Sequence, residues 1–324
     1  MAPVTFLPQP VHADAIGILE ERGSVLRGYG EDAVTIEEAA GSVHAILTRA
    51  HPVRAEVIAA APALAVIGRA GVGVDTIDVD AATQRGIPVA ITPRANYRAV
   101  AEHAVALLLT QYKHIAHLDT AVREGRFAER EVRTGRETRG RTLGVLGLGR
   151  IGSEVARMAL GGLGMTVLGH TRRPDAVAVE GLELVAGVDE LLARSDVLSV
   201  HVPLTPDTRG LLGARELALL PEGAVLVNTS RAQVVDEAAL AEALLEGRLG
   251  GACLDVFADE PPRPDNPLLS APRTVLTPHS AAFTEEAIRQ MGVDAAEAVV
   301  AVLEGRRPAP DCVVNPQALD LAGL

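Results

Sequence analysis

The stretch RTLGVLGLGRIG, residues 141–152, decides the fold of this 324-residue chain. Leu143–Leu146 is a short apolar run, which predicts a buried strand. Gly147, Gly149 and Gly152 follow with the spacing G-x-G-x-x-G, and the residues after them have a helical pattern. A glycine turn between a strand and a helix is typical of dinucleotide-binding sites.

Each glycine of this turn has its own physical reason. Gly147 makes the tight turn, and Gly149 lets a pyrophosphate approach the backbone. Gly152 lets the helix pack closely on the strand. The helix N-terminus offers free N–H groups to the phosphates. We therefore expect this turn to bind a nicotinamide dinucleotide.

Composition excludes several classes of function. The net charge of −12 argues against binding to nucleic acid, so any anionic ligand must be met by local arginines. Lys113 is the only lysine, which makes Schiff-base chemistry improbable. Cys253 and Cys312 are too few for a disulfide framework, and no stretch predicts a membrane span or a signal peptide. We expect a cytoplasmic protein that binds neither membranes nor metals.

Strand and helix patterns alternate along both halves of the chain, which predicts parallel sheets with helices on both faces. In the first half, the expected strands are 4–7, 43–48, 65–68 and 88–91, and the expected helices include 52–60 and 79–85. In the second half, the expected strands are 143–146, 166–169, 197–200, 224–228, 251–255 and 274–276, and the expected helices are 153–160, 187–194, 214–219, 237–246 and 285–304. One long helix is expected over 99–124, between the two halves.

The Pro-rich tail at 308–316 is too short to be a domain, so we expect it to pack back on the first half. The predicted fold class is α/β, with two doubly wound parallel-sheet domains. Residues 1–98 and 289–324 would form a discontinuous, flavodoxin-like substrate domain. Residues 99–288 would form a Rossmann dinucleotide-binding domain.

The segment after the strand at 166–169 bears on the choice of cofactor. NAD enzymes place an acid about 20 residues beyond the glycines, but Thr171 stands there and Arg172 and Arg173 follow it. A small hydroxyl beside guanidinium groups suits a 2′-phosphate, because arginine offers paired N–H donors. This favours NADP(H) over NAD(H). The alternative is that the arginines form a solvated turn and Asp175 supplies the acid.

Three segments of the second half follow predicted strands and carry reactive side chains. Arg231 ends VNTSR (227–231), LDVFADEP (254–261) contains Asp255 and Glu260, and His279 ends TPH (277–279). Ligands of open α/β sheets bind at the carboxyl ends of the strands, so we expect these residues to meet. A fixed cation, a carboxylate and an imidazole are what hydride transfer between nicotinamide and a carbonyl requires.

These segments resemble the D-isomer-specific 2-hydroxyacid dehydrogenase family. The resemblance covers nearly the whole chain after about residue 40, with the order and spacing of the motifs kept. The matching motifs are GRAGVGVDTIDVDAATQRGIPV (68–89), NYRAVAEHAVALLL (96–109), GLGRIG (147–152), HVPLTPDTRGLL (201–212), NTSRAQVVDEAAL (228–240), LDVFADEP (254–261) and TPHSAAFTEEA (277–287).

The resemblance implies a role for each matching residue. Arg231 would bind the substrate carboxylate and carbonyl, His279 would be the acid/base, and Glu260 would orient His279. Val72 and Gly73 would offer backbone N–H groups to the substrate carboxylate. Cofactor contacts would come from the glycines already named, from Thr171, Arg172 and Arg173, and from Arg150, Ile151, His201, Pro203, Thr208, Thr229, Ser230, Asp255, His279 and Ala281. Within this set, Arg150 and Ile151 would meet the pyrophosphate, and Asp255 the nicotinamide carboxamide.

The expected reaction is hydride transfer between NAD(P) and C2 of a small D-2-hydroxy or 2-oxo acid. Arg49 and Arg69 resemble the basic residues with which phosphoglycerate dehydrogenases meet a distal phosphate, although both could instead form salt bridges between domains. An NADP-type site favours glyoxylate or hydroxypyruvate reduction. Two other functions remain open: a formate or phosphite oxidiser of the same fold, and a corepressor-like protein that senses the cofactor. The resemblance also implies a homodimer through the second domain.

Overall fold

The computed structural model describes residues 2–324, which divide into two compact units. One unit comprises residues up to Asn96 together with Phe283–Leu324, and the other comprises Tyr97–Ala282. The sequence predicts boundaries after residues 98 and 288, and the structure places them slightly earlier. The reason is that each boundary precedes a long helix, α5 at Tyr97–Tyr112 and α11 at Glu285–Leu303, which stays whole.

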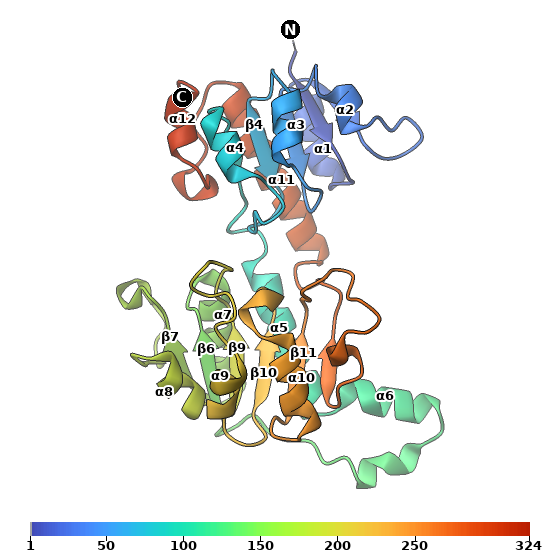
Figure 1. The fold of residues 1–324 in the computed structure, drawn as a ribbon, viewed down its shortest axis with the longest axis vertical. Coiled ribbons are helices and arrows are strands. Elements are labelled where there is room, and N and C mark those ends of the chain that lie inside the picture. The colour runs from blue at the N-terminus through green and yellow to red at the C-terminus, as the bar shows by residue number, and fades with distance from the viewer. Residues whose placement is uncertain (1) are drawn as a thin grey trace. The chain divides into compact units, whose positions relative to one another are not determined.

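The first unit contains one sheet of five parallel strands in the order β2-β1-β3-β4-β5 (Figure 1). Their bounds are Val4–Leu7 (β1), Ser24–Arg27 (β2), Ala45–Thr48 (β3), Val66–Arg69 (β4) and Val89–Ala90 (β5). This is the flavodoxin-like order, in which the direction of winding reverses between β1 and β3. The predicted fold class of this unit is therefore confirmed.

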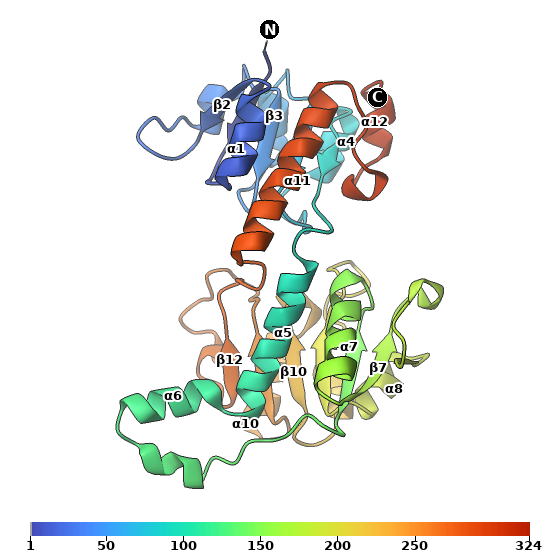
Figure 2. The same ribbon diagram turned by 180° about the vertical axis from the view of Figure 1, so that it is seen from behind.

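Helices cover both faces of this sheet. Helix α1 (Ala13–Glu20) lies beside α11 on one face (Figure 2). The other face carries α2 (Ile36–Ala39), α3 (Ala55–Ala60) and α4 (Val79–Gln84). The core of that face includes the fully buried side chains Phe6, Ile46, Ile58, Ile67 and Ile87.

The C-terminal tail packs on the free edge of the same sheet. Val313 forms an antiparallel bridge with Ala90 of β5. Asn315, which is 1% exposed, accepts a hydrogen bond from the Val89 N–H at 2.7 Å. A last helix, α12 (Gln317–Leu321), then packs against α4. Residues more than 200 positions away in the sequence therefore form hydrogen bonds with β5, the edge strand of this sheet.

The second unit contains seven parallel strands in the order β12-β11-β10-β9-β6-β7-β8. Their bounds are Thr142–Leu146 (β6), Thr166–His170 (β7), Glu183–Leu184 (β8), Val197–Val200 (β9), Val225–Asn228 (β10), Gly251–Leu254 (β11) and Thr274–Leu276 (β12). This is the Rossmann order with one strand added beyond β11. The reversal of winding lies between β6 and β9, and β6 leads into the glycine turn.

Helices α5 and α7 (Arg150–Gly162) cover one face of this second sheet (Figure 2). Helices α8 (Val188–Ala193), α9 (Ala214–Leu219) and α10 (Glu237–Leu245) cover the other face (Figure 1). Short 3-10 turns occur at Phe127–Glu131, Pro174–Ala176, Ala232–Val234 and Pro267–Leu269, and in the first unit at Pro310–Cys312. Both faces of the sheet are thus closed from solvent, and its carboxyl edge is left for ligands.

The prediction of one helix over 99–124 is wrong. The chain breaks at His114, whose φ of 55° is left-handed, and α6 (Ile115–Arg123) continues in a new direction. The reason lies in packing: the buried face of α5 ends at Tyr112, and Ala121 is the only buried residue of α6. Because the other apolar side chains of α6 are not buried against the sheet, the second half of the predicted helix leaves the sheet.

Among residues 2–324, no helix combines the length and the apolar character that crossing a lipid bilayer requires.

Candidate active site

The glycine turn after β6 is shaped as a dinucleotide requires. Gly147 has a φ of 98°, and a Cβ there would lie 2.7 Å from the carbonyl oxygen of His201. A Cβ on Gly152 would lie 2.0 Å from the Gly147 carbonyl oxygen, so only glycine lets α7 approach the turn. A Cβ on Gly149 would meet nothing within 4 Å among the described residues. The turn is thus closely packed at its first and third glycines and open at its second.

Helix α7 begins directly at this open position. Its N-cap is Gly149, and no side chain caps its first N–H groups. The first N–H groups of a helix have no acceptor within the helix, and the helix dipole gives this end a partial positive charge. Arg150 and Ile151 are the first residues of α7. The turn therefore fits a pyrophosphate without any change of backbone.

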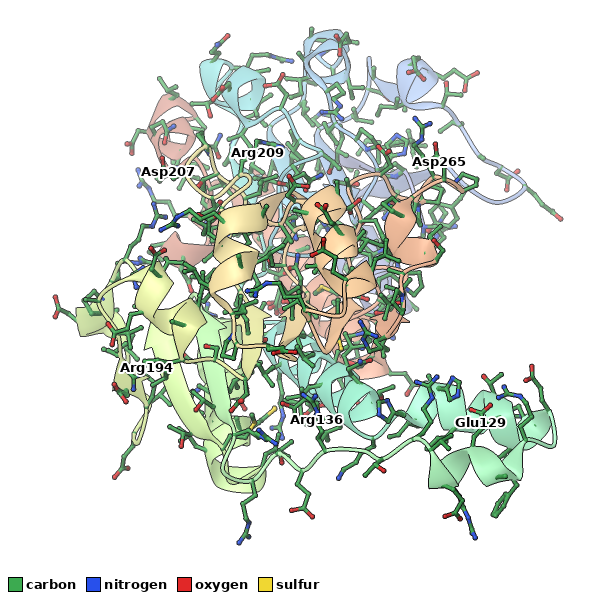
Figure 3. The ribbon with its side chains drawn as sticks, turned by 60° about the horizontal axis from the view of Figure 1, so that its bottom comes forward. Glu129, Arg136, Arg194, Asp207, Arg209 and Asp265 are labelled. Carbon is green, nitrogen blue, oxygen red and sulfur yellow. The ribbon has the colours of Figure 1, made fainter. Side chains whose placement is uncertain are left out.

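The end of β7 carries Thr171, Arg172 and Arg173, which the sequence predicts to meet the ribose of the cofactor. The Thr171 hydroxyl accepts a hydrogen bond from the N–H of Arg173 at 3.3 Å. The Arg172 guanidinium lies 3.7 Å from the carboxylate of Asp207, and both side chains are exposed. Asp207 projects from the loop after β9 (Figure 3). An exposed pair of this kind contributes about 0–1 kcal/mol, so Arg172 can exchange Asp207 for another anion.

The loop after β9 contributes His201, Pro203 and Thr208. His201 Nε2 lies 2.7 Å from the Ser199 hydroxyl, and burial lowers the pKa of His201 to about 4, so its imidazole is neutral at pH 7. The buried Thr208 hydroxyl donates to the Pro203 carbonyl at 2.6 Å and accepts from the Thr205 N–H at 2.8 Å. Thr208 therefore holds the loop that the resemblance assigns to the cofactor.

The loop after β10 is organised by Asn228, a residue that sequence reasoning did not single out. Its side-chain oxygen accepts from the N–H and the hydroxyl of Ser230 at 2.9 and 2.8 Å, and its amide donates to the Arg231 carbonyl at 3.0 Å. Asn228 is 1% exposed, so these bonds fix the direction in which Arg231 leaves the strand. The Thr229 hydroxyl between them is buried without a hydrogen-bond partner among the described residues.

Glu260 and His279 form the central contact of this edge. The Nδ1 atom of His279 lies 2.7 Å from one carboxylate oxygen of Glu260, and the other oxygen accepts from the Phe257 N–H at 3.2 Å. Burial by itself would raise the pKa of Glu260, but the bonds from His279 and Phe257 and the charge of Arg231 together lower it. Glu260 is therefore a carboxylate at neutral pH. Bound to Nδ1, it leaves Nε2 of His279 to exchange a proton.

The turn that carries His279 is held by Asp255. The Asp255 carboxylate accepts from the Thr277 hydroxyl at 2.6 Å and from the N–H groups of Ser280 and Ala281, both at 2.9 Å. His279 itself has a left-handed φ of 50°, and its N–H donates to the Asp255 carbonyl at 2.8 Å. These bonds occupy both carboxylate oxygens of Asp255 and hold His279 in a backbone conformation that an L-residue rarely adopts.

A histidine from helix α5 joins this network. The Nε2 atom of His103 lies 3.0 Å from the Thr277 hydroxyl and 3.5 Å from the Asp255 carboxylate. Burial by itself would raise the pKa of Asp255, but the hydrogen bonds from His103, Thr277 and the turn lower it. The side chain of Asp255 is 1% exposed and still ionised. Thr277, like Asn228, lies inside a quoted motif but was not singled out.

Arg49 and Ala70 of the first unit line a cavity of about 190 Å³. The cavity lies where the winding of the five-stranded sheet reverses, and His12, Ile288 and Met291 complete its wall. The Arg49 guanidinium also lies 4.9 Å from the ring centre of Phe283. The wall of this cavity therefore combines a guanidinium group with apolar side chains.

The loop after β4 contains Val72 and Gly73. Among the hydrogen bonds of residues 2–324, none is donated by the N–H of Val72 or of Gly73. Adjacent N–H groups without an acceptor form a small anion-binding concavity. The predicted site residues thus form two sets. The first unit carries Arg49, Arg69 and the loop of Val72 and Gly73, and the second unit carries the glycine turn, Arg231, Glu260 and His279.

The chain is similar to known proteins in both sequence and structure. The model of the NAD-binding domain of D-isomer specific 2-hydroxyacid dehydrogenases matches residues 105–281. The D-3-phosphoglycerate dehydrogenase of Methanocaldococcus jannaschii is 42% identical over 299 residues, which are 91% of this chain and 56% of the relative. This chain therefore spans just over half the length of that relative.

Two further proteins match along most of their own length. The glyoxylate reductase of Korarchaeum cryptofilum is 42% identical over 262 residues, which are 79% of this chain and 78% of the relative. The crystal structure of a D-lactate dehydrogenase from Aquifex aeolicus, complexed with NAD and lactic acid, superposes with a TM-score of 0.84. It is 29% identical, and the match covers 96% of this chain and 99% of that one.

Proposed function

Because the chain belongs to the D-isomer specific 2-hydroxyacid dehydrogenase family, we propose that it transfers a hydride between a nicotinamide cofactor and C2 of a small D-2-hydroxy or 2-oxo acid. The observation that carries this proposal is the 2.7 Å contact between His279 and Glu260, close enough to Arg231 for its charge to act on Glu260. This trio lies at the carboxyl edge of the sheet that also carries the glycine turn.

Each member of the trio has one task. Arg231 binds the substrate carboxylate and polarises the carbonyl oxygen, because a guanidinium offers paired donors to such groups. His279 gives a proton to that oxygen in reduction and takes it back in oxidation. Glu260 orients the imidazole and stabilises its charged form. The bound nicotinamide supplies or accepts the hydride, and the Val72 and Gly73 N–H groups hold the carboxylate.

We propose that the cofactor lies on the glycine turn, with its pyrophosphate at Gly149, Arg150 and Ile151. We propose that the loops of His201, Ser230 and Ala281 meet its nicotinamide end, and the buried Thr229 hydroxyl, which has no hydrogen-bond partner among the described residues, supports this. The carboxylate of Asp255 is already bonded to the 277–281 turn, so its task is to position that turn. Thr171, Arg172 and Arg173 favour the 2′-phosphate of NADP(H), since no acid follows β7 directly.

The substrate is a two- or three-carbon acid of the glyoxylate, hydroxypyruvate or phosphoglycerate type. The cavity beside Arg49 supports a substrate whose distal end is polar or anionic. A homodimer is the assembly we propose, formed through the second unit. Its support is the projecting arm of residues 113–136, on which Ile115, Val122, Phe127 and Val132 are exposed by 51–80%.

The test is a matched set of initial rates. The purified protein is given NADH or NADPH with glyoxylate, hydroxypyruvate, pyruvate or phosphohydroxypyruvate, and loss of the reduced cofactor is followed. We expect reduction of at least one of these acids, with the larger kcat/KM for NADPH. His279→Ala should lower turnover about 100-fold or more while cofactor binding persists, on the scale of general acid catalysis.

The other outcomes contradict particular parts of the proposal. Larger kcat/KM with NADH would remove the role of Arg172 and Arg173 and leave the reaction intact. Tight cofactor binding with no turnover of any acid would favour a cofactor sensor, and turnover of formate or phosphite alone would favour the oxidiser. Near-normal turnover by His279→Ala would exclude that residue as the acid.

A further inference from the structure

Arg69 is the last residue of β4 and Arg49 directly follows β3, so both lie at the carboxyl edge of the first sheet, but their side chains have different surroundings. Arg49 lines the cavity and lies against the ring of Phe283. The Arg69 guanidinium instead is bound by its own loop: Nε donates to the Gly73 carbonyl at 2.9 Å, and Nη1 donates to the Ala70 carbonyl at 2.7 Å. The two arginines therefore need separate explanations.

The loop closes around this guanidinium. Gly71 has a φ of 146°, which L side chains rarely adopt, and a Cβ there would lie 2.7 Å from Nη1 of Arg69, so another residue would strain the backbone and displace the guanidinium. The Gly71 carbonyl accepts from the Thr92 N–H at 2.9 Å, and the Ala70 N–H donates to the Thr48 carbonyl at 2.8 Å. These bonds tie the first half of the loop to its neighbours. Arg69 ties the second half, at Gly73.

A guanidinium is a rigid planar fork, so its two bonds set the spacing between the Ala70 and Gly73 carbonyls. Val72 lies between these two fixed points, and its side chain is 43% exposed. Arg69 donates hydrogen bonds to the Ala70 and Gly73 carbonyls, on either side of Val72. The N–H groups of Val72 and Gly73 donate to no acceptor among the described residues, so they can bind a ligand. The positive charge beneath them also favours an anion.

We infer that Arg69 is a positioning residue, which shapes the 70–73 loop so that its N–H groups accept a carboxylate. This inference rests on the proposed function for the identity of that carboxylate, the C1 group of the substrate. It replaces the expectation that Arg69 contacts a distal phosphate. It also separates the two arginines, since recognition of the distal group is then left to the cavity of Arg49.

The experiment compares wild-type protein with Arg69→Gln, Arg69→Lys and a matched control, Arg85→Gln. The Arg85 guanidinium also donates to backbone carbonyls of the first unit, those of Ala61 and Pro62 at 3.1 and 3.2 Å, but it lies outside the loop. All four proteins are saturated with reduced cofactor and titrated calorimetrically with oxalate, which consists of two joined carboxylates and has no distal group. Amide hydrogen exchange is followed in peptides that span residues 70–75.

We expect Arg69→Gln to bind oxalate about tenfold more weakly and to exchange faster in the loop, with Arg69→Lys between it and wild type. Arg85→Gln should match wild type in both readouts, even if it melts at a lower temperature. In steady-state assays, Arg69→Gln should raise KM about equally for every 2-oxo acid that the wild type reduces and leave kcat within about twofold. That pattern is expected because the carboxylate is held equally in ground state and transition state.

Three outcomes would overturn the inference. One is a KM effect confined to phosphohydroxypyruvate, which would make Arg69 a phosphate ligand. Another is unchanged exchange in the loop of Arg69→Gln. The third is an equal effect of Arg85→Gln on oxalate. If wild-type protein neither binds oxalate nor reduces any acid, the proposed function fails, and the exchange data still decide whether Arg69 shapes the loop.

Discussion

At the scale of single residues, the site depends on side chains whose work is to hold other groups. Asp255, Asn228 and Thr208 are each buried. The polar atoms of each form hydrogen bonds with the backbone or with neighbouring side chains of one loop. A buried polar group costs free energy unless it is paired, so such residues are stable only in one loop conformation. That conformation is what places His279, Arg231 and the loop after β9.

His201 gives a prediction at this scale. Its pKa is about 4 in the folded protein, because of burial, against 6.5 ordinarily. The unfolded chain therefore binds a proton between pH 6.5 and 4 that the folded chain does not. Stability must rise with pH across this window and fall on acidification. A shift of this size corresponds to about 3 kcal/mol at most.

We expect His201→Asn to lack this dependence. The measurement is the urea-unfolding free energy of both proteins by circular dichroism, from pH 8 down to pH 4.5. At pH 8, the difference between their free energies of unfolding measures the packing lost and the hydrogen bond to Ser199 lost in the variant. Between pH 6.5 and 4.5, wild type should lose about 1–3 kcal/mol more than the variant. Parallel curves would show that His201 titrates normally in the folded protein.

At the scale of elements, the sequence predicted the bounds of several segments whose apolar residues form a clear pattern. The strands at 4–7, 197–200 and 274–276 and the helix at 214–219 have the predicted bounds. The edge strands β2 and β8 were missed, because Ser24–Arg27 and Glu183–Leu184 are too exposed to show an apolar pattern. The break at His114 was missed because a helical pattern does not report where the supporting sheet ends.

The same reasoning explains which site residues could be predicted. Arg231, Glu260 and His279 stand at strand ends within motifs, and the sequence placed them on one edge. Asn228 and Thr277 stand in the same motifs, but their partners are set by the alignment of neighbouring strands. Only the structure shows that the Thr277 hydroxyl meets His103 from a helix 174 residues away. Hydrogen bonds of this range leave no local signal in a sequence.

The tail that closes the edge of the first sheet yields an element-scale prediction. The buried Asn315 side chain accepts from Val89 and donates to the Thr83 hydroxyl at 2.8 Å and the Ile87 carbonyl at 3.0 Å. Asn315→Ala would leave the buried Val89 N–H and Ile87 carbonyl without this partner, at a cost of about 1–3 kcal/mol for each, while the Thr83 hydroxyl keeps its bond to the Val79 carbonyl at 2.6 Å.

We therefore expect Asn315→Ala to destabilise the first unit by at least about 2 kcal/mol and to speed amide exchange at Val89, as measured by urea unfolding and by hydrogen exchange. The neighbouring Val314, which is 37% exposed, is the control. Val314→Ala should change the stability by less than about 0.5 kcal/mol. Equal effects of the two variants would show that the tail is held by its apolar contacts and not by Asn315.

At the scale of the whole molecule, the arm of residues 113–136 stands out from an otherwise closed second unit. It consists of α6 and the 3-10 turn at Phe127–Glu131, and Glu129 lies on it (Figure 3). Four large apolar side chains of this arm, Ile115, Val122, Phe127 and Val132, are exposed, and exposed apolar surface can mark a site of protein–protein contact. An ion pair between Arg126 and Glu129 and a hydrogen bond between His117 and Glu129 fix the turn, so the exposed apolar side chains are presented by a defined structure.

This arm carries the last prediction, that it forms the dimer contact. A second copy would bury the apolar side chains at a stabilisation of about 25 cal/mol per Å². A carboxylate in that contact would be buried without a partner, so Phe127→Asp combined with Val132→Asp should convert a dimer to a monomer. The measurement is sedimentation equilibrium at micromolar protein. Leu245→Asp is the control, because Leu245 is 67% exposed on α10, outside the arm. A dimer that survives the paired change, or dissociates equally with Leu245→Asp, would place the contact elsewhere.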